Sequence, residues 1–440
     1  MSTLKDSGTL KGLILAAPAS GSGKTTITLG LLRCLRQRGV AAIGAKTGPD
    51  YIDPGFHAAA SGLPSINLDP WAMRTGTIHR LVKGMTGAEV VLCEGVMGLF
   101  DGAGTHADKG STADLAALTD WPVVLVIDVQ GQSASVAALV NGFVNHRRDV
   151  DVRGVILNRV GSDRHEVMLR HALERSRIPV LGAVRRVDAI KVPSRHLGLV
   201  QATEHRDLEA FLDQAAELVA HSVNIDLLLS WVAAPALPGA TNPPPPPLGQ
   251  RIAVARDDAF RFAYAHLLAG WREQGAELHF FSPLDDEAPA PSADAIFLPG
   301  GYPELYAGWL AGADRFRGGM IAAAESGTLI YGECGGYMVL GDGLIDASGT
   351  GHAMLGLLPV STSMVEAKRC LGYRQAVGLD GPWAGQRWRG HEFHFARITG
   401  TGDAPTLWRI TDADGLGETV AGHRRGSVSG AFLHLIDRTE

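Results

Sequence analysis

The chain has 440 residues, of which 45% are hydrophobic and 20% charged, a composition typical of a folded globular protein rather than a disordered or fibrous one. Its 40 Lys and Arg against 46 Asp and Glu give a net charge of −6, without the basic excess typical of nucleic-acid-binding proteins. The apolar runs are far shorter than the roughly 20 residues that cross a bilayer, and the N-terminus does not resemble a signal peptide, so we expect a cytoplasmic protein with no nucleic-acid or membrane partner.

Buried strands alternate with helices in residues 1–233. Residues 12–17 form an unbroken apolar run, typical of a strand covered on both faces of a parallel sheet. Residues 24–38 follow with helical spacing of their apolar side chains. Further strands buried on both faces are predicted at 41–45, 90–93, 123–127 and 154–157. The alternation predicts an α/β domain with a mostly parallel sheet flanked by helices.

A glycine-rich segment, Pro-Ala-Ser-Gly-Ser-Gly-Lys-Thr-Thr, connects the first strand to the first helix. In a phosphate-binding loop, glycines let backbone N–H groups surround the phosphates, a lysine reaches the β- and γ-phosphates, and a hydroxyl binds Mg²⁺. Pro18 replaces the usual first glycine of the strict pattern. We predict that the segment binds a nucleotide and that Thr25 is a Mg²⁺ ligand. The predicted binding residues are Gly21, Gly23, Lys24, Thr25 and Thr26.

Acidic residues follow the next strands, where parallel sheets bind their ligands. Glu94 ends one strand, and Asp50 and Asp53 follow another. Because Mg²⁺ usually takes one or two carboxylates beside phosphate oxygens, Glu94 and Asp53 are candidate metal ligands. The alternatives are a helix-capping role for Glu94 and a plain turn at Asp50 and Asp53. Lys46 is a candidate second positive charge for the phosphates, or a surface lysine.

Two later features of this segment are also candidates. Asn158 follows a strand, and its amide could both donate to and accept from the edge of adenine. Five basic residues gather within a short span, which by itself indicates a solvated surface. They are Arg185, Arg186, Lys191, Arg195 and Arg206.

A proline-rich linker is predicted at residues 234–250. It contains five consecutive prolines, which favour an extended conformation outside any core. The expected domains are therefore 1–233 and 251–440, each long enough to bury its own core. The second is predicted to be another α/β domain with a mostly parallel sheet, from apolar strands at 252–255, 278–281, 295–298 and 329–331.

Cys334 lies in Gly-Glu-Cys-Gly-Gly, directly after the last of these strands. A nucleophile in a sharp turn between a strand and a helix is exposed, and the helix N-terminus is expected to lower the pKa of its thiol. The N–H of Gly335 would point toward an oxyanion. A second donor is expected from Gly301, in a glycine loop that follows an earlier strand. A base is also needed, and spacing alone does not choose among His391, His394 and His434.

Residues 251–440 resemble the triad-type (class I) glutamine amidotransferase domains, in the branch fused to amide synthases of the cobalamin pathway. Residues 1–233 resemble the P-loop ligase domain of dethiobiotin synthetase-like enzymes. Together they resemble the cobyrinate or hydrogenobyrinate a,c-diamide synthase family. The segments that carry these resemblances are 46–54, 94–102, 193–199, 299–304, 332–336, 390–394 and 432–434.

The resemblance implies two coupled reactions. Cys334, with His434 as its base and Gly301 and Gly335 as oxyanion donors, would release ammonia from glutamine. ATP with Mg²⁺ would convert a substrate carboxylate to an acyl phosphate, which ammonia would displace. The substrate would be a corrinoid with many carboxylates, which would also account for the basic residues by ionic pairing. Its predicted contacts are Asp50, Tyr51, Asp101 and Arg195.

Two departures from related patterns stand out. Ile436 occupies the place of the acid that orients the histidine in the broader amidotransferase class, and Asp437 would point to the opposite side of a strand. A Cys–His pair is therefore expected. Ala19 replaces the additional lysine of partition-type ATPases, which disfavours a P-loop ATPase switch with a passenger domain.

The remaining alternatives within the enzyme class are cobyric acid synthase-like and nickel-sirohydrochlorin a,c-diamide synthase-like activities. Whether the ring contains cobalt, and whether the protein forms a homodimer, stay open at this level.

Overall fold

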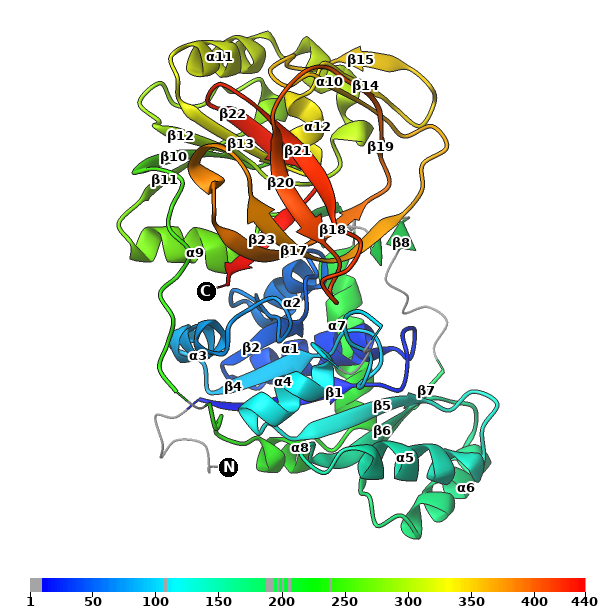
Figure 1. Cartoon of the computed structure of the whole chain (residues 1–440). Coiled ribbons are helices and arrows are strands. Elements are labelled where there is room, and N and C mark those ends of the chain that lie inside the picture. The colour runs from blue at the N-terminus through cyan, green and yellow to red at the C-terminus, as the bar shows by residue number, and fades with distance from the viewer. Residues whose placement is uncertain are drawn as a thin grey trace. The chain divides into compact units, whose positions relative to one another are not determined.

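The computed structural model describes residues 10–105, 109–186, 194–195, 198–199, 202–204, 207–237 and 239–439. The chain forms two compact units (Figure 1). Unit 1 comprises Met1–Trp71 and Thr75–Asn242, and unit 2 comprises Ala72–Arg74 and Pro243–Glu440. The functional boundaries expected from the sequence, 1–233, 234–250 and 251–440, stay a prediction.

Unit 1 is built on a parallel sheet with the strand order β3-β2-β4-β1-β5-β6-β7. Its apolar side chains pack against helices, as the unbroken apolar runs predicted. The strands are β1 (Lys11–Ala16), β2 (Ala42–Thr47), β3 (Ile66–Leu68), β4 (Val90–Glu94), β5 (Val123–Asp128), β6 (Val152–Val160) and β7 (Val180–Arg185). The helices are α1 (Lys24–Gln37), α2 (Asp53–Ser61), α3 (Thr75–Gly84), α4 (Thr112–Thr119), α5 (Ser135–His146), α6 (Asp163–Glu174), α7 (Leu208–Ser222) and α8 (Ile225–Trp231).

The central position of β1 sets the place of the phosphate loop. Strand β1 lies between β4 and β5, and its side chains are almost completely buried. Strand β2 pairs with β4 in a register that sets Lys46 beside Glu94. Because the strands are parallel, the loops after β1, β2 and β4 begin at the same edge of the sheet.

Unit 2 contains a sheet with the order β11-β10-β12-β13-β22-β21-β20-β17-β18-β23. The pairings from β11 to β22 are parallel, and those from β22 to β23 are antiparallel. The strands are β10 (Arg251–Ala255), β11 (Glu277–Phe281), β12 (Ala295–Leu298), β13 (Leu329–Glu333), β17 (Cys370–Gly378), β18 (Arg387–His394), β20 (Thr406–Thr411), β21 (Thr419–Arg425), β22 (Val428–Ala431) and β23 (His434–Arg438).

The α/β class expected for both parts of the chain is confirmed, and the predicted buried strands lie within three residues of their expected bounds. The antiparallel half of the second sheet was not predicted. Strands such as β17 and β18 mix polar and apolar residues, because much of each is only partly buried. They lack the unbroken apolar runs that identify strands buried on both faces.

Helices and a small second sheet complete unit 2. The thiol-bearing turn lies between β13 and α12, and apolar side chains of α12, α11 and α10 share one core. The small sheet has the order β15-β14-β16-β19. The bounds are α9 (Ala265–Glu273), α10 (Ala307–Gly312), α11 (Asp314–Glu325), α12 (Gly335–Leu340), β14 (Gly343–Ile345), β15 (Gly351–Ala353), β16 (Val360–Ser363) and β19 (Arg397–Thr401).

The described part of the proline segment has no helix or strand, but it does not stay outside a core. Pro245 is buried, and its carbonyl accepts a hydrogen bond of 2.7 Å from Gln274 Nε2 at the end of α9. A Cβ on Gly270 would lie 2.5 Å from Pro244 Cβ, so the helix and the prolines are in close contact. Leu248 packs against a hydrophobic core that includes Trp271, Trp383 and Trp388. The expectation of a free spacer is therefore wrong for this half of the segment.

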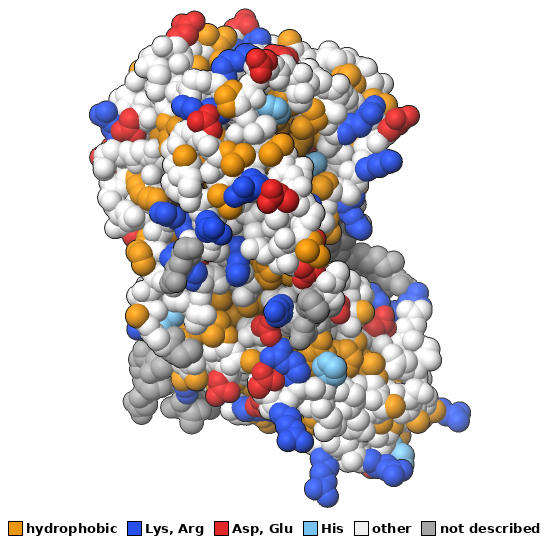
Figure 2. All heavy atoms as spheres, in the orientation of Figure 1, with side chains coloured by type: hydrophobic (Ala, Val, Ile, Leu, Met, Phe, Trp, Pro, Cys, Tyr) orange, Lys and Arg blue, Asp and Glu red, His pale blue; other side chains and the backbone are white. Residues whose placement is uncertain are grey.

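Charged side chains of both signs share the surface. On the face shown in Figure 2, Lys and Arg side chains are interspersed with Asp and Glu side chains. Within the residues that the structure describes, none of the helices combines the length and apolar character needed to cross a membrane.

Candidate active sites

The turn between β1 and α1 has the backbone of a phosphate loop. Gly21 and Gly23 have φ values of +80° and +90°, in the left-handed region that favours glycine. Ser22 Oγ donates to the carbonyl of Ala19 at 2.8 Å, which closes the loop on itself. Helix α1 then begins at Lys24. The glycines at these two places are thus required by the turn.

Lys24 folds back over this loop. Its Nζ donates to the carbonyl of Met97 at 2.6 Å and lies 3.5 Å from that of Ala19. Burial lowers the pKa of this ammonium to about 8, although Glu94 and other carboxylates oppose the shift. A nucleotide phosphate would therefore offer this cation a charged partner in place of neutral carbonyls.

Thr25 and Glu94, which were predicted to share a metal site, lie in direct contact. Thr25 Oγ1 donates to Glu94 Oε1 at 2.6 Å. Glu94 is completely buried, and its carboxylate also accepts from Lys46 Nζ at 3.0 Å and contacts His57 Nε2 at 2.8 Å. Burial alone would raise the pKa of Glu94, but Lys46, His57 and Thr25 together hold it below its usual range.

Lys46 lies between two carboxylates rather than on the surface. It is buried and forms ion pairs with Asp53 and Glu94. Burial alone would lower its pKa, but these two carboxylates raise it above the ordinary value. The surface alternative for Lys46 is therefore wrong, and its charge is already balanced by acids. A direct role toward phosphate stays a prediction.

His57 is a member of this cluster that the sequence did not reveal. It lies four residues after Asp53 on α2, and this spacing places both side chains on the same face of the helix. Asp53 is buried at the start of that helix, and burial together with Asp50 and Glu94 raises its pKa to about 7. The metal role predicted for Asp53 stays a prediction.

The substrate residues expected in this unit have different surroundings. The carboxylate of Asp50 accepts from the backbone N–H of Ile52 and Asp53 at 2.8 and 2.9 Å, as a turn residue does. Asp101 is exposed and accepts from Gly98 N at 2.8 Å. Tyr51 is partly buried in the loop before α2.

Asn158 contacts the phosphate loop itself. Its Nδ2 donates to the carbonyl of Ser22 at 2.9 Å, and a Cβ on Gly23 would lie 2.2 Å from that nitrogen. One N–H of this amide group therefore braces the loop, and the group has a second N–H and an oxygen besides. Contact of Asn158 with a nucleotide stays a prediction.

The basic residues near position 190 are only partly described. Arg185 forms ion pairs with Asp163 and Glu166 on α6, so its charge is balanced within the unit. Arg195 lies on the short strand β8 (Ser194–Arg195), with its side chain outside the described part. Lys191 and Arg206 also lie outside the described residues.

In unit 2, Cys334 lies at the sharp turn predicted between β13 and α12. Its φ of +48° is rare for a residue with a side chain and is typical of a nucleophile elbow. A Cβ on Gly336 would lie 2.0 Å from the carbonyl oxygen of Leu298, so only glycine fits behind the turn. The thiol lies 3.8 Å from the carbonyl of Phe393.

The two predicted oxyanion donors lie side by side. A Cβ on Gly335 would lie 3.0 Å from the backbone nitrogen of Gly301. The N–H of Gly335 also interacts with the Cys334 thiol and lowers its pKa, against the larger effect of burial. The geometry is therefore compatible with an oxyanion hole formed by these two residues, a role that stays a prediction.

Of the three candidate histidines, His434 lies beside the cysteine. A Cβ on Gly300 would lie 3.3 Å from His434 Nε2 and 3.2 Å from Cys334 Cβ. The ring of His391 lies 5.1 Å from that of His434, with its Nδ1 3.3 Å from the Tyr264 hydroxyl. His394 stacks on Phe432 and contacts the carbonyl of Ala396 through Nδ1 at 2.8 Å.

Burial controls the protonation of the Cys–His pair. It raises the pKa of the Cys334 thiol well above its ordinary value, whereas it lowers the pKa of His434 to about 3. The expectation that the helix N-terminus lowers the thiol pKa is therefore wrong, because desolvation outweighs it. The resting pair is a neutral thiol beside a neutral imidazole, and the imidazole can accept the thiol proton.

Two acids near His434 have distinct environments. Glu333 is buried, and its Oε2 lies 3.7 Å from His434 Nδ1. Asp437 is also buried, but it accepts from Arg74 Nη2 at 2.9 Å and Arg74 Nε at 3.1 Å. Asp437 therefore forms an ion pair with an arginine that is 363 positions away in the sequence. The sequence did not reveal Glu333, although an acid in an otherwise apolar strand was a visible signal.

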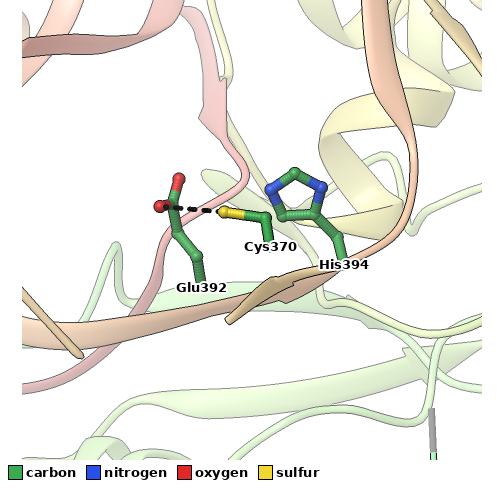
Figure 3. A group of neighbouring side chains, drawn as sticks. All are labelled: Cys370, Glu392 and His394. Atoms are coloured by element: carbon green, nitrogen blue, oxygen red, sulfur yellow. Dashed lines mark hydrogen bonds between the residues drawn. The ribbon is translucent and has the colours of Figure 1, made fainter. Parts of the chain in front are cut away.

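A further cluster lies near the thiol site on β17 and β18. Figure 3 shows Cys370, Glu392 and His394, whose potential ligand atoms all lie within 4.8 Å of one another. The Glu392 carboxylate accepts from Arg374 Nε at 2.7 Å, and Arg374 Nη2 lies 3.8 Å from Cys370 Sγ. The guanidinium thus already supplies the positive charge that a metal would bring.

Comparison with known proteins agrees with this two-part arrangement. Residues 13–200 match the CobQ/CobB/MinD/ParA nucleotide binding domain, and residues 251–439 match the CobB/CobQ-like glutamine amidotransferase domain. A hydrogenobyrinate a,c-diamide synthase from Brucella anthropi is 57% identical over 97% of this chain and 99% of its own length. Proteins of the same name from Rhizobium meliloti and Rhodobacter capsulatus are 54% and 51% identical, over 98% and 97% of this chain and 100% and 98% of their own lengths. The chain therefore belongs to the hydrogenobyrinate a,c-diamide synthase family.

Proposed function

We propose that this enzyme uses ATP and glutamine to amidate the a- and c-side-chain carboxylates of hydrogenobyrinic acid in cobalamin biosynthesis. The observation that carries the proposal is that one chain combines a phosphate loop with a thiol at a nucleophile elbow. Neither site alone accounts for a reaction that needs both ATP and glutamine. The names of its relatives favour hydrogenobyrinate over cobyrinate as substrate.

The thiol site is proposed to supply ammonia. Cys334 Sγ attacks the side-chain amide carbon of glutamine while its proton passes to His434. The oxyanion that forms accepts hydrogen bonds from Gly301 and Gly335. Ammonia leaves with a proton from His434, and water then hydrolyses the thioester to glutamate. The close approach of Gly335 to the Gly301 nitrogen supports this assignment.

The phosphate-loop site is proposed to activate the carboxylate. Lys24 and the loop N–H groups bind the ATP phosphates while a substrate carboxylate oxygen attacks the γ-phosphorus, giving an acyl phosphate and ADP. Ammonia then attacks the acyl carbon and phosphate leaves. Asp50, Tyr51, Asp101 and Arg195 are proposed to contact the corrinoid, and Asn158 to brace the loop that holds the nucleotide.

The residues present fit Mg²⁺. Thr25, Glu94 and Asp53 offer only oxygen ligands, which Mg²⁺ prefers, and Thr25 and Glu94 are in contact. Bound there, the ion would neutralise charge on the phosphates. Lys46 and His57 hold the carboxylate of Glu94 in place for this role.

Product analysis tests the substrate. Purified enzyme is incubated with ATP, Mg²⁺, glutamine and one of three acceptors: hydrogenobyrinate, cobyrinate or nickel-sirohydrochlorin. Mass spectrometry should show two successive amidations, each a loss of one oxygen and a gain of NH, fastest with hydrogenobyrinate. Diamide from nickel-sirohydrochlorin alone would identify the wrong ring system. More than two amidations would favour a cobyric acid synthase-like activity.

The different-class alternative, an ATPase switch with a passenger domain, is tested by glutamine hydrolysis. A switch of this kind would hydrolyse ATP without converting glutamine to glutamate. The homodimer and the cytoplasmic location remain predictions. Light scattering during size-exclusion chromatography measures the former.

A further inference from the structure

Glu333 is the last residue of β13 and directly precedes Cys334. It is only 3% exposed and belongs to a strand whose other residues are uncharged. Its Oε1 accepts a hydrogen bond of 3.0 Å from the backbone N–H of Leu435, the residue that follows His434. Its Oε2 lies 3.7 Å from His434 Nδ1. The carboxyl group is therefore fixed to the same strand that carries the histidine.

The two nitrogens of the His434 ring face different partners. Nδ1 faces Glu333, whereas Nε2 lies beside the position that a Gly300 Cβ would take, next to Cys334 Cβ. A hydrogen on Nδ1 leaves the lone pair of Nε2 available for the thiol proton. An acid at Nδ1 is what selects this tautomer in other catalytic triads.

We propose that Glu333 is the positioning acid of this amidotransferase, reaching His434 from the strand of the nucleophile instead of from the strand of the histidine. The inference rests on the proposed glutamine hydrolysis at Cys334. Among the described residues, the two other acids near this ring have arginine partners. Asp437 pairs with Arg74, and Glu392 pairs with Arg374.

The separation of 3.7 Å is longer than a hydrogen bond, as is common for catalytic contacts without substrate. Burial raises the pKa of Glu333 to about 8, while the Leu435 N–H and the Tyr331 hydroxyl oppose the shift. When the Cys334 proton moves to Nε2, the ring becomes a cation that attracts the Glu333 carboxylate. The interaction is therefore strongest as the thiolate attacks, which is when it contributes to the rate.

Several other titratable groups face this pair, and a pH experiment must separate them. His391, Glu392 and His394 approach from β18, and Tyr331 and Cys334 from the chain of β13 itself. Glu304, in the short 3₁₀ helix Pro303–Leu305 that follows β12, acts on the thiol and raises its pKa. Glu304 is a second acid that acts on the cysteine, whereas Glu333 faces His434 Nδ1, so Glu304→Gln provides a control.

The test compares Glu333→Gln with wild type in glutamine hydrolysis. The glutamine side chain can still accept from Leu435 N–H but cannot carry charge. We expect kcat to fall by about 10- to 100-fold, the usual effect of losing a group that orients a functional histidine, with little change in KM. The rise of wild-type kcat as Glu333 loses its proton near pH 8 should also disappear. Glu304→Gln should keep that rise.

Amidation with ammonia in place of glutamine reports folding, because it does not use the thiol. If Glu333→Gln loses that activity as well, Glu333→Asp decides, because it keeps the charge and should retain the pH-dependent rise. If Glu333→Gln has the kcat and the pH profile of the wild type, the role of Glu333 is overturned, while the proposed function stands. A wild-type enzyme that does not hydrolyse glutamine would instead overturn the proposed function, and the inference with it.

Discussion

Unit 2 has three candidate histidines for the thiol site, and their contacts differ. His391 lies next to the Tyr264 hydroxyl, and His394 is held by the carbonyl of Ala396 and by stacking on Phe432. His434 is the one that lies between Cys334 and an acid. A base needs reach toward the nucleophile and a neutral resting state. His434 lies beside Cys334, and burial keeps its ring neutral by lowering its pKa. The lowered pKa also weakens the ring as a base, so a neighbouring acid that stabilises the protonated ring matters here.

His434→Ala should therefore lower glutamine hydrolysis by about 10²- to 10⁴-fold, the usual contribution of a general base. Ammonia-driven amidation should survive, because it bypasses the thiol. His391→Ala is the matched control, since its ring lies only 5.1 Å away. Near-normal hydrolysis in His434→Ala, with loss in His391→Ala or His394→Ala, would assign the base to another histidine.

Asp437 gives a prediction about stability rather than catalysis. It is fully buried and paired with Arg74, whose side chain is 23% exposed. Removing one partner of a buried ion pair leaves an uncompensated charge, so Arg74→Ala should cost about 3 kcal/mol in the free energy of unfolding. Urea unfolding of Arg74→Ala and Asp437→Asn measures this.

The double variant serves as the control for this pair. It should lose less stability than the sum of the two single variants, because the residues interact directly. Additive losses would show that the pair contributes no coupling. Glutamine turnover per folded molecule should stay close to wild type in Asp437→Asn.

Sequence reasoning predicts site residues where the signal is local, and it misses contacts whose partners come from distant strands. Cys334 and Lys24 are identified by the turns around them. The pairing of Lys46 with Glu94 depends on the register of β2 with β4, and the pairing of Asp437 with Arg74 joins distant parts of the chain. No spacing rule in one sequence gives such contacts.

At the scale of elements, the loop between β1 and α1 is supported by its neighbours. Asn158 at the end of β6 holds the carbonyl of Ser22, and Lys24 binds the carbonyl of Met97 after β4. The loop conformation is thus set before a nucleotide arrives, which lowers the entropic cost of binding.

Lys24→Ala should abolish amidation with glutamine and with ammonia alike, because both need the acyl phosphate. Glutamine hydrolysis by unit 2 should persist at a measurable rate, and this shows that the variant is folded. Thr28→Ala, one turn along the same helix, is the control for helix damage. ATP-dependent amidation at the normal rate in Lys24→Ala would contradict the assignment of the phosphate loop.

Most of the parallel strands of both sheets were predictable because burial on both faces produces unbroken apolar runs, but the parallel strands β3, β7 and β22 were not predicted. The antiparallel strands β17, β18, β20 and β21 were not. In β21, for example, the one buried residue is a glycine, and no alternation of apolar and polar residues marks the strand. Strand β18 also carries Glu392 and His394. His394 was therefore predictable from the sequence as a candidate base, but the strand on which it lies was not.

For the whole molecule, the two chemistries depend on separate groups in separate units. Cys334→Ala should abolish synthesis from glutamine yet retain amidation with high ammonia, at pH values where free NH₃ is present. Product formation is followed by mass spectrometry with each nitrogen source. Loss of both activities in a folded Cys334→Ala variant would refute this division between the units.

The assignment of Ala72–Arg74 to unit 2 has a consequence for the covalent organisation of the enzyme. The polypeptide passes between the units three times, after Trp71, after Arg74 and after Asn242. A gene truncated at the proline segment would encode an amidotransferase module that retains the buried Asp437 but has lost its counter-ion. The two units are thus not two consecutive segments of the chain, because unit 2 includes Ala72–Arg74. An amidotransferase unit made on its own would need a replacement for Ala72–Arg74, which lie far upstream in the sequence.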